Sequence, residues 1–112
     1  MTMTTAPRGA TTILLIRHGE TAWNAERRLQ GHLDIALNAE GERQAAALGA
    51  ALTGERIDRV LSSDLARARQ TAEAIVAARG VGVPDGGAVE RDPQLRERCY
   101  GGFEGLLYSE IA

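Results

Sequence analysis

A continuous apolar run at residues 11–16 (Thr-Thr-Ile-Leu-Leu-Ile) is the feature that most narrows the fold of this 112-residue chain. A strand without a polar face must be covered on both sides, as strands are in the parallel sheets of α/β proteins. The run ends abruptly at Arg17, so residues 17–21 are expected just past the carboxyl end of a buried strand. The run therefore predicts an α/β fold in which helices cover the sheet.

Two helices are expected to provide that cover. The first is predicted to begin after Asn38, a favourable N-cap, and to run to Leu52, with Gly54 placed to end it. Its inward positions recur at i, i+3, i+4 and i+7, which is the spacing of one helix face. They are Ala45, Leu48, Gly49 and Leu52.

The second helix is predicted over residues 65–79, with Ser63 or Asp64 as its cap and Gly80 at its end. Its inward face shows the same helical spacing. The residues on it are Leu65, Ala68, Ala72, Ile75 and Val76.

Short strands are expected at residues 59–62 and, from a weaker pattern, at 88–91, with a loop over 81–87 between them. The remaining segments are read as an ordered loop with one helical turn at 22–37, a Gly-rich loop at 95–105 and a helix beginning near Leu106. The order strand, helix, strand, helix, strand predicts a parallel sheet with right-handed crossovers.

Polar and basic residues follow the first two predicted strands. They are Arg17, His18 and Asn24 after the first, and Ser62, Ser63 and Arg67 after the second. Because ligands bind outside the carboxyl ends of parallel strands, both sets are expected at one crevice. Two guanidinium groups and the free N–H groups of a helix start would suit a doubly charged phosphate.

A neutral imidazole at such a site can attack phosphorus directly, so His18 is expected to be the nucleophile of a phosphohistidine reaction. Arginine neutralises the phosphate charge without a metal. The leaving oxygen needs a proton, and Glu97, after the third predicted strand, is the best-placed donor. The residues alone also allow plainer interpretations, in which His18 is a structural histidine and Arg67 and Arg69 are exposed.

The composition restricts the partners and the compartment. The net charge is -2 and the 13 basic residues are all arginine, which argues against a nucleic-acid or membrane-surface binder. A single cysteine, Cys99, and a segment 1–10 without an apolar signal region favour a cytoplasmic protein with a disordered lead-in. No apolar run approaches the ~20 residues that a membrane span needs.

Three blocks of residues, taken together, resemble the histidine phosphatase superfamily, which includes the cofactor-dependent phosphoglycerate mutases. The first block is Arg17-His18-Gly19-Glu20-Thr21 with residues 22–24, 30–34 and 37–41, the second is 62–68 with 70–72, and the third is 95–98 with 100–105. The resemblance covers residues 12–112. It implies a phosphoglycerate mutase-like, three-layer α/β/α fold with a mostly parallel sheet, of which residues 11–112 form the N-terminal half.

The resemblance also implies roles for the matching residues, without a metal or another cofactor. His18 is similar to the phospho-accepting nucleophile, Arg17 and Arg67 to the phosphate-binding arginines, and Glu97 to the proton donor and acceptor of the family. Substrate contacts are implied for Asn24, Gln30, Gly31, Arg98 and Tyr100.

The family pocket has a second histidine late in the chain, and this sequence holds only His18 and His32. His32 comes too early to match it and is read as a polar loop residue. We therefore expect an N-terminal half whose C-terminal part is missing, with poor folding and little activity on its own. Without flanking strands, residues 13–16 are expected to present unpaired backbone and apolar faces.

Two departures from the mutases favour a phosphatase. Gln30 stands where the mutases have Thr, and residues 106–108 (Leu-Leu-Tyr) offer no Lys to an anionic substrate. The expected partner is a small phosphorylated metabolite, with no nucleic acid or membrane partner, and a homodimer is left open. A phosphoglycerate mutase and, from another class, an inactive phosphoryl-binding or scaffold fragment remain the alternatives.

Overall fold

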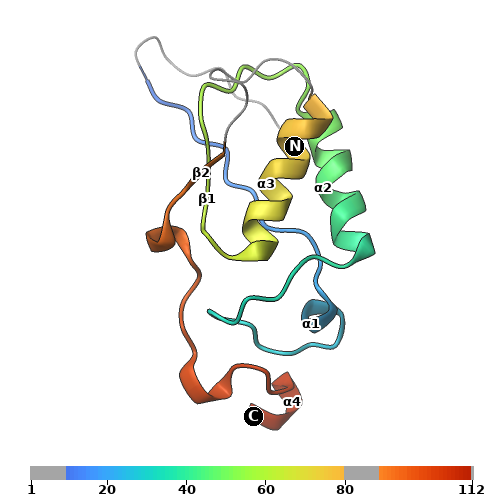
Figure 1. The fold of residues 1–112 in the computed structure, drawn as a ribbon, viewed down its shortest axis with the longest axis vertical. Helices are drawn as coiled ribbons and strands as arrows, with labels where there is room; N and C mark the ends of the chain where they lie inside the picture. The colour runs from blue at the N-terminus through green and yellow to red at the C-terminus, as the bar shows by residue number, and fades with distance from the viewer. Residues whose placement is uncertain (1–9, 80–88, 112) are drawn as a thin grey trace.

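The computed structural model describes residues 10–79 and 89–111 and has an α/β architecture (Figure 1). All four α-helices and both strands of the described residues begin within two residues of the start that the sequence pattern predicts. The elements are α1 (Ala22–Ala25), α2 (Ala39–Ala51), β1 (Val60–Ser62), α3 (Ala66–Arg79), β2 (Val89–Arg91), the 3-10 helices η2 (Pro93–Leu95) and η3 (Gly101–Phe103), and α4 (Tyr108–Ile111).

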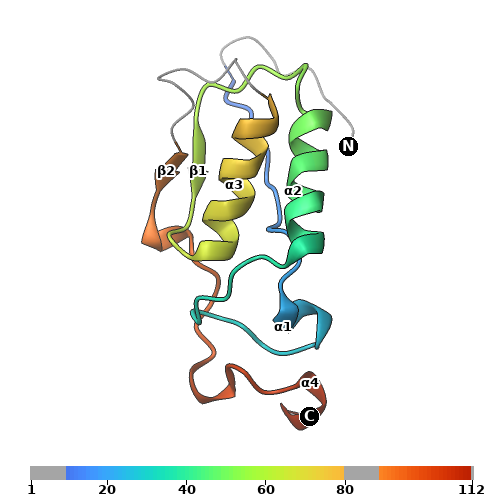
Figure 2. The ribbon, with the colours of Figure 1, turned by 45° about the vertical axis from the view of Figure 1, so that its right-hand side comes forward.

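The two strands pair in parallel, with Val60 opposite Val89 and Ser62 opposite Arg91. Helices α2 and α3 lie side by side next to this sheet in both ribbon views (Figures 1 and 2). The predicted α/β class with a parallel sheet is therefore confirmed. The residues that the structure describes form one sheet layer and one helical layer.

Helix α2 begins as its sequence predicts. The side-chain oxygen of Asn38 accepts a hydrogen bond from the N–H of Gly41 at 2.8 Å, which satisfies one of the free donors of the first turn. The core between the two helices is small and aliphatic, as the low aromatic content requires. Its buried apolar side chains include Ala45, Leu52, Leu65, Ala72 and Ile75.

The start of α3 differs from the prediction. Its first N–H, that of Ala66, donates to Oδ1 of Asp34 at 2.6 Å, so the cap comes from a distant loop. Asp64 is engaged by Arg96, and Ser63 only accepts a bond of 3.4 Å from the N–H of Leu65. The prediction that Ser63 or Asp64 caps this helix is thus wrong, because a tertiary contact supplies the carboxylate instead.

The apolar run at residues 11–16 is not a strand, which corrects the sequence prediction. Residues 10–20 carry no regular secondary structure and are drawn as a plain blue trace in Figure 1. A strand needs a neighbour for its backbone groups, and the described residues form a ladder only between β1 and β2. Ile13 is 73% and Leu15 94% exposed, which confirms the expectation of apolar faces left uncovered.

Below the helical pair, the chain folds into a second group of short elements around α1 and α4 (Figure 2). Residues 28 and 107 form an antiparallel bridge, and the N–H of Leu29 donates to the carbonyl of Leu106 at 3.0 Å.

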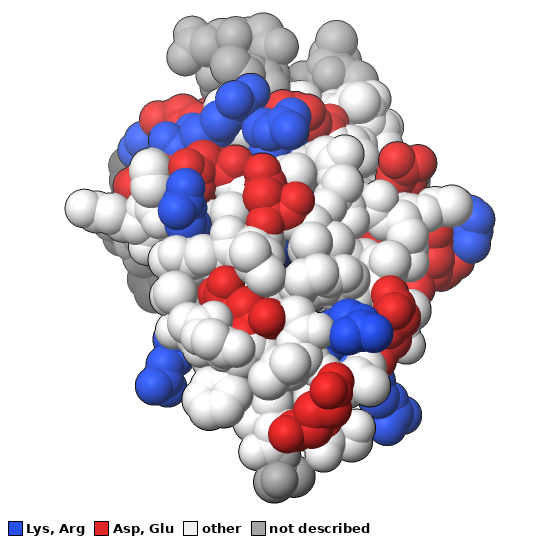
Figure 3. Space-filling model, turned by 60° about the horizontal axis from the view of Figure 1, so that its bottom comes forward, with Lys and Arg blue, Asp and Glu red and all other residues white. Residues whose placement is uncertain are grey.

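On the face that Figure 3 shows, acidic and basic side chains are interspersed with wide uncharged areas.

Some predictions fall outside the described residues. These are the lead-in at 1–9, the loop at 81–87, the helix end at Gly80 and the first residue of the third predicted strand, Ala88. Within residues 10–79 and 89–111, no helix is long and apolar enough to cross a membrane.

Candidate active site

His18 lies half-buried on the segment that follows the apolar run. Its Nδ1 is 2.6 Å from the carbonyl oxygen of Gly19. Because a carbonyl oxygen only accepts hydrogen bonds, Nδ1 carries the proton in the neutral ring. The lone pair of the neutral imidazole is therefore on Nε2.

The surroundings of His18 favour this neutral form. Burial lowers the pKa of the imidazole below its ordinary value of 6.5, and the positive charges of Arg67 and Arg17 lower it further. The bond to Gly19 and the negative charge of Glu97 act in the opposite direction. Arg67, Glu97 and Arg17 are thus close enough to His18 to act on its ring electrostatically.

Two helices hold the His18 segment in place. The N–H of Gly19 donates to Oγ1 of Thr71 at 2.9 Å, and this hydroxyl donates to the carbonyl of Arg67 at 2.7 Å. On the other side, Gly19 packs directly on the first turn of α2, since a Cβ at Gly19 would lie 2.5 Å from the carbonyl oxygen of Gly41. Only a glycine allows this close approach.

Arg67 is the most buried charged residue of the site, with 1% of its surface exposed. Its Nη1 donates to the carbonyl of Leu33 at 2.7 Å, and its Nη2 donates to the carbonyl of Gly31. The same Nη2 lies 3.5 Å from Oε2 of Glu97. The guanidinium therefore joins α3 to the loop at residues 31–33 and to the predicted proton donor.

Glu97 reaches the same loop from the C-terminal side. Its Oε1 accepts a hydrogen bond from the N–H of Gly31 at 3.1 Å, and its side chain is 39% exposed. The carboxylate thus has one oxygen on a backbone donor and the other near Arg67, while it remains open to solvent.

Arg17 directly precedes His18 in the chain. It is exposed and lines a shallow hollow of about 230 Å³ together with His18, Gly19, Gln44, Ala45, Leu48 and Thr71. Arg67 and Glu97 do not line this hollow. This hollow therefore does not hold both arginines, although the charges of both act on the His18 ring.

One donor at the predicted N-terminus of α3 is already engaged in this structure. The first N–H of this helix already faces the carboxylate of Asp34, as described above. Ser62 and Ser63 are buried, and the Ser62 hydroxyl donates to the carbonyl of Ser63 at 2.8 Å. The Ala66 N–H is therefore occupied by an acidic side chain, and the expectation that the helix start adds to the positive field stays a prediction.

Asn24 and Gln30 make internal contacts at the start of α1. The Asn24 side chain forms a capping box with Thr21 and accepts a bond from its N–H at 3.1 Å. Gln30 is 4% exposed, and its Oε1 accepts a bond of 2.6 Å from the Thr21 hydroxyl. Their contacts with substrate stay predictions, as does that of Gly31.

Arg98 and Tyr100 lie next to each other beyond Glu97. The guanidinium carbon of Arg98 is 5.8 Å from the centre of the Tyr100 ring, a cation–π contact. Their predicted role as substrate contacts stays untested. Within the described residues, no group of three or more His, Cys, Asp or Glu side chains is arranged to hold a metal ion.

Three residues that the sequence interpretation did not assign to the site support it. Thr71 lies one helical turn after Arg67, so its spacing placed it on the same helix face. His32 contributes Nε2, which is 2.7 Å from the carbonyl of Glu97. Oε1 of Glu104 accepts from the N–H groups of His32 and Tyr100 at 2.7 and 3.2 Å, a long-range pairing that no local pattern indicates.

Comparison with proteins of known sequence identifies similar chains. Phosphoglycerate mutase-like protein 4 of Arabidopsis thaliana is 48% identical over 101 residues, which cover 89% of this chain and 42% of that protein. A probable phosphoglycerate mutase, GpmB, of Erwinia tasmaniensis is 46% identical over 92 residues, which cover 82% of this chain and 40% of that protein. The chain thus spans less than half the length of the curated relatives it matches.

Solved structures of similar proteins also match this chain over less than half of their own length. Mycobacterial glucosyl-3-phosphoglycerate phosphatase in complex with VO3 matches with a TM-score of 0.71 and 37% identity, over 84% of this chain and 44% of that chain. Phosphoserine phosphatase of Entamoeba histolytica in complex with 3-phosphoglyceric acid matches with a TM-score of 0.71 and 33% identity, over 84% of this chain and 43% of that chain. The fold is therefore that of the phosphoglycerate mutase-like histidine phosphatases.

The family model of the histidine phosphatase superfamily (branch 1) matches residues 13–112, which include residues 13–16 of the apolar run, both helices of the core and every residue of the site. On this evidence, the chain belongs to the histidine phosphatase superfamily.

Proposed function

We propose that the whole protein hydrolyses small phosphomonoesters through a phosphohistidine on His18. The observation that carries the proposal is the state of the imidazole. Its Nδ1–H is committed to the carbonyl of Gly19, and its lowered pKa keeps the ring neutral near pH 7. A neutral ring with a free Nε2 lone pair is the form that can attack phosphorus.

The reaction assigns one role to each neighbouring charge. Nε2 attacks the phosphorus, the P–O bond to the leaving group breaks, and Glu97 gives its proton to the leaving oxygen. Water then attacks the phosphorus of the phosphohistidine, Glu97 takes up a proton from it, and inorganic phosphate leaves. Arg17 and Arg67 stabilise the charge on the phosphoryl oxygens; Arg67 has five N–H donors and commits one each to Leu33 and Gly31.

The choice of a phosphatase rests on the residues that would bind a second substrate as the acceptor of the phosphoryl group. Residues 106–108 bring no cationic side chain, so a second anionic substrate has no charged partner there. The relatives named above include both mutase-like proteins and phosphatases. Water as the acceptor requires no additional binding group, which supports hydrolysis over transfer.

Phosphate release from a panel of small phosphomonoesters by the whole protein tests the proposal. We expect turnover without added metal, and its loss in His18→Ala. If the protein instead interconverts phosphoglycerates in the presence of a bisphosphoglycerate primer and releases no phosphate, the mutase alternative is correct.

A covalent-labelling experiment separates an enzyme from an inactive phosphoryl-binding module. An enzyme of this kind acquires an acid-labile, alkali-stable phosphate on incubation with substrate, and His18→Ala abolishes it. Labelling that persists in His18→Ala would remove His18 from its proposed role, and a protein that binds phosphate esters without any labelling would be a binding module.

A further inference from the structure

Glu97 lies on a stretch of chain without regular secondary structure, between η2 and η3. A carboxylate that must reach one position reproducibly needs support from outside its own backbone. In this chain two contacts from other segments hold the backbone at residues 96–97. The inference below rests on the proposed role of Glu97 as the proton donor.

The first contact is an ion pair one residue before Glu97. Nε and Nη2 of Arg96 each donate to one carboxylate oxygen of Asp64 at 2.6 Å, in a bidentate arrangement. Arg96 lowers the pKa of Asp64 below its ordinary value, so the pair stays charged at neutral pH. Asp64 lies between β1 and α3, and the pair therefore anchors residue 96 to the more regular part of the fold.

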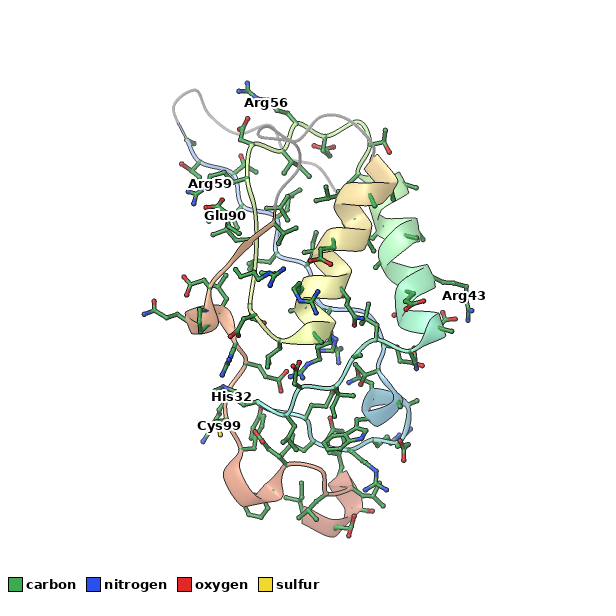
Figure 4. The ribbon with its side chains drawn as sticks, in the orientation of Figure 1. His32, Arg43, Arg56, Arg59, Glu90 and Cys99 are labelled. Carbon is green, nitrogen blue, oxygen red and sulfur yellow. The ribbon has the colours of Figure 1, made fainter. Side chains whose placement is uncertain are left out.

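The second contact acts on Glu97 itself. Since a carbonyl only accepts, His32 donates its Nε2–H to the backbone carbonyl of Glu97 at 2.7 Å. Its neighbour Gly31 donates its N–H to the Glu97 carboxylate. One loop thus holds both the backbone and the side chain of Glu97, and Figure 4 shows His32 next to the C-terminal segment near Cys99.

We propose that Asp64 and His32 are positioning residues for Glu97, which fix its carboxylate beside Arg67 and the His18 ring. Neither side chain touches the reacting atoms. Asp64 acts through Arg96, and His32 acts through the Glu97 carbonyl and the adjacent Gly31 N–H.

Kinetics with two leaving groups test this in the whole protein. An alkyl phosphate such as glycerol phosphate needs a proton on its leaving oxygen, whereas p-nitrophenyl phosphate hardly does. Asp64→Asn is expected to lower kcat/KM for the alkyl ester about tenfold and to leave the nitrophenyl ester within about twofold, as a misplaced general acid does. Glu97→Gln is the reference and should show the same selectivity more strongly.

The matched control is Glu90→Gln. Glu90 forms the same kind of bidentate pair with Arg59, at 2.8 and 2.7 Å, and Figure 4 shows this pair well away from His32. The control should leave both esters within about twofold, because an exposed ion pair contributes little. Equal losses on both esters in Asp64→Asn would reduce Asp64 to a stability role and overturn its part of the proposal.

Amide hydrogen exchange at Gly31 gives a readout that does not depend on turnover. Displacement of Glu97 exposes this N–H, so exchange should accelerate about tenfold in Asp64→Asn and in His32→Leu, as in Glu97→Ala, which removes the acceptor. His32→Gln, which keeps a donor, should restore protection, and Glu90→Gln should not change it. Unchanged exchange in Asp64→Asn and His32→Leu would overturn the proposal. If Glu97→Gln does not discriminate between the two esters, the acid role of Glu97 fails, while the exchange data still decide the positioning.

Discussion

His18 combines partial burial with two nearby positive charges, and each of these lowers the pKa of its imidazole. As the pH falls, the unfolded chain takes up a proton near the ordinary value of 6.5 before the folded chain does. The free energy of unfolding therefore decreases as the pH drops through this range. The reactive neutral ring, by contrast, persists to lower pH than in an isolated histidine.

We predict that Arg17→Gln raises the pKa of His18 towards its ordinary value, since it removes one of the charges that lower it. NMR titration of the imidazole signals measures this directly, and the chain has only two histidines. Arg43→Gln is the control, because Arg43 pairs with Glu40 on the outer side of α2 (Figure 4). A His18 titration that is the same in all three proteins would contradict the electrostatic link.

Arg67 also has a structural role, which does not depend on a bound phosphate. We predict that Arg67→Leu lowers the free energy of unfolding by about 2–4 kcal/mol, because the carbonyls of Gly31 and Leu33 lose a charged donor in a buried place. Arg69→Leu, on the same helix and paired among the described residues with exposed Glu73, should cost at most about 0.5 kcal/mol. Urea unfolding measures the free energy of unfolding of both variants. Equal losses would show that the bonds from Arg67 to the loop at residues 31–33 do not stabilise the fold.

At the scale of elements, sequence periodicity predicted α2, β1, α3 and β2 because each is encoded by its own residues. The segment after Asn38 has a cap, a helical face and a stop within one stretch. The start of α3 could not be predicted in this way, because its cap is Asp34, far away along the chain. The run at 11–16 was assigned as a strand from its composition, but a strand also requires a paired neighbour.

The same distinction between local patterns and long-range contacts applies to the candidate site. The positions of His18, Arg67 and Glu97 near one another followed from strand order and from family resemblance. The contacts that support them did not, since Thr71, His32 and Glu104 act through bonds between remote segments. Local patterns therefore indicated the charged groups, and only the folded chain showed what holds them.

The packing of α2 on α3 gives a prediction at this scale. A Cβ at Gly49 would lie 2.6 Å from the Cβ of Ala78 and 2.8 Å from the carbonyl oxygen of Ile75. Alanine favours a helix by about 1 kcal/mol over glycine, but here the two helices must separate to admit it. We therefore expect Gly49→Ala to lower the free energy of unfolding by about 1–3 kcal/mol.

Gly54→Ala is the control for that substitution. An added Cβ at Gly54 meets nothing within 4 Å, so the change should stay within about 0.5 kcal/mol of the parent. Thermal or urea unfolding measures both variants. A stabilised Gly49→Ala protein would show that the helices are not in close contact at this position.

At the scale of the whole molecule, the apolar side chains of residues 13–16 differ from those of the core in their exposure to solvent. Leu15 is 94% exposed and Leu52 is 0% exposed, although both are leucines in apolar stretches. Exposed apolar surface of this kind favours self-association in a free polypeptide. It also means that Leu15 contributes almost no burial energy to the chain in this form.

These two leucines provide the last prediction. Leu15→Asp should leave the free energy of unfolding of the 112-residue chain within about 0.5 kcal/mol, because the side chain is already in water. It should also reduce self-association, as seen by sedimentation or light scattering at increasing concentration. Leu52→Ala should cost about 2–5 kcal/mol, since it leaves a cavity in the only helical layer that the described residues form. If Leu15→Asp unfolds the chain to the same extent as Leu52→Ala, then Leu15 is buried in solution, and residues 11–16 pair with a partner that covers them.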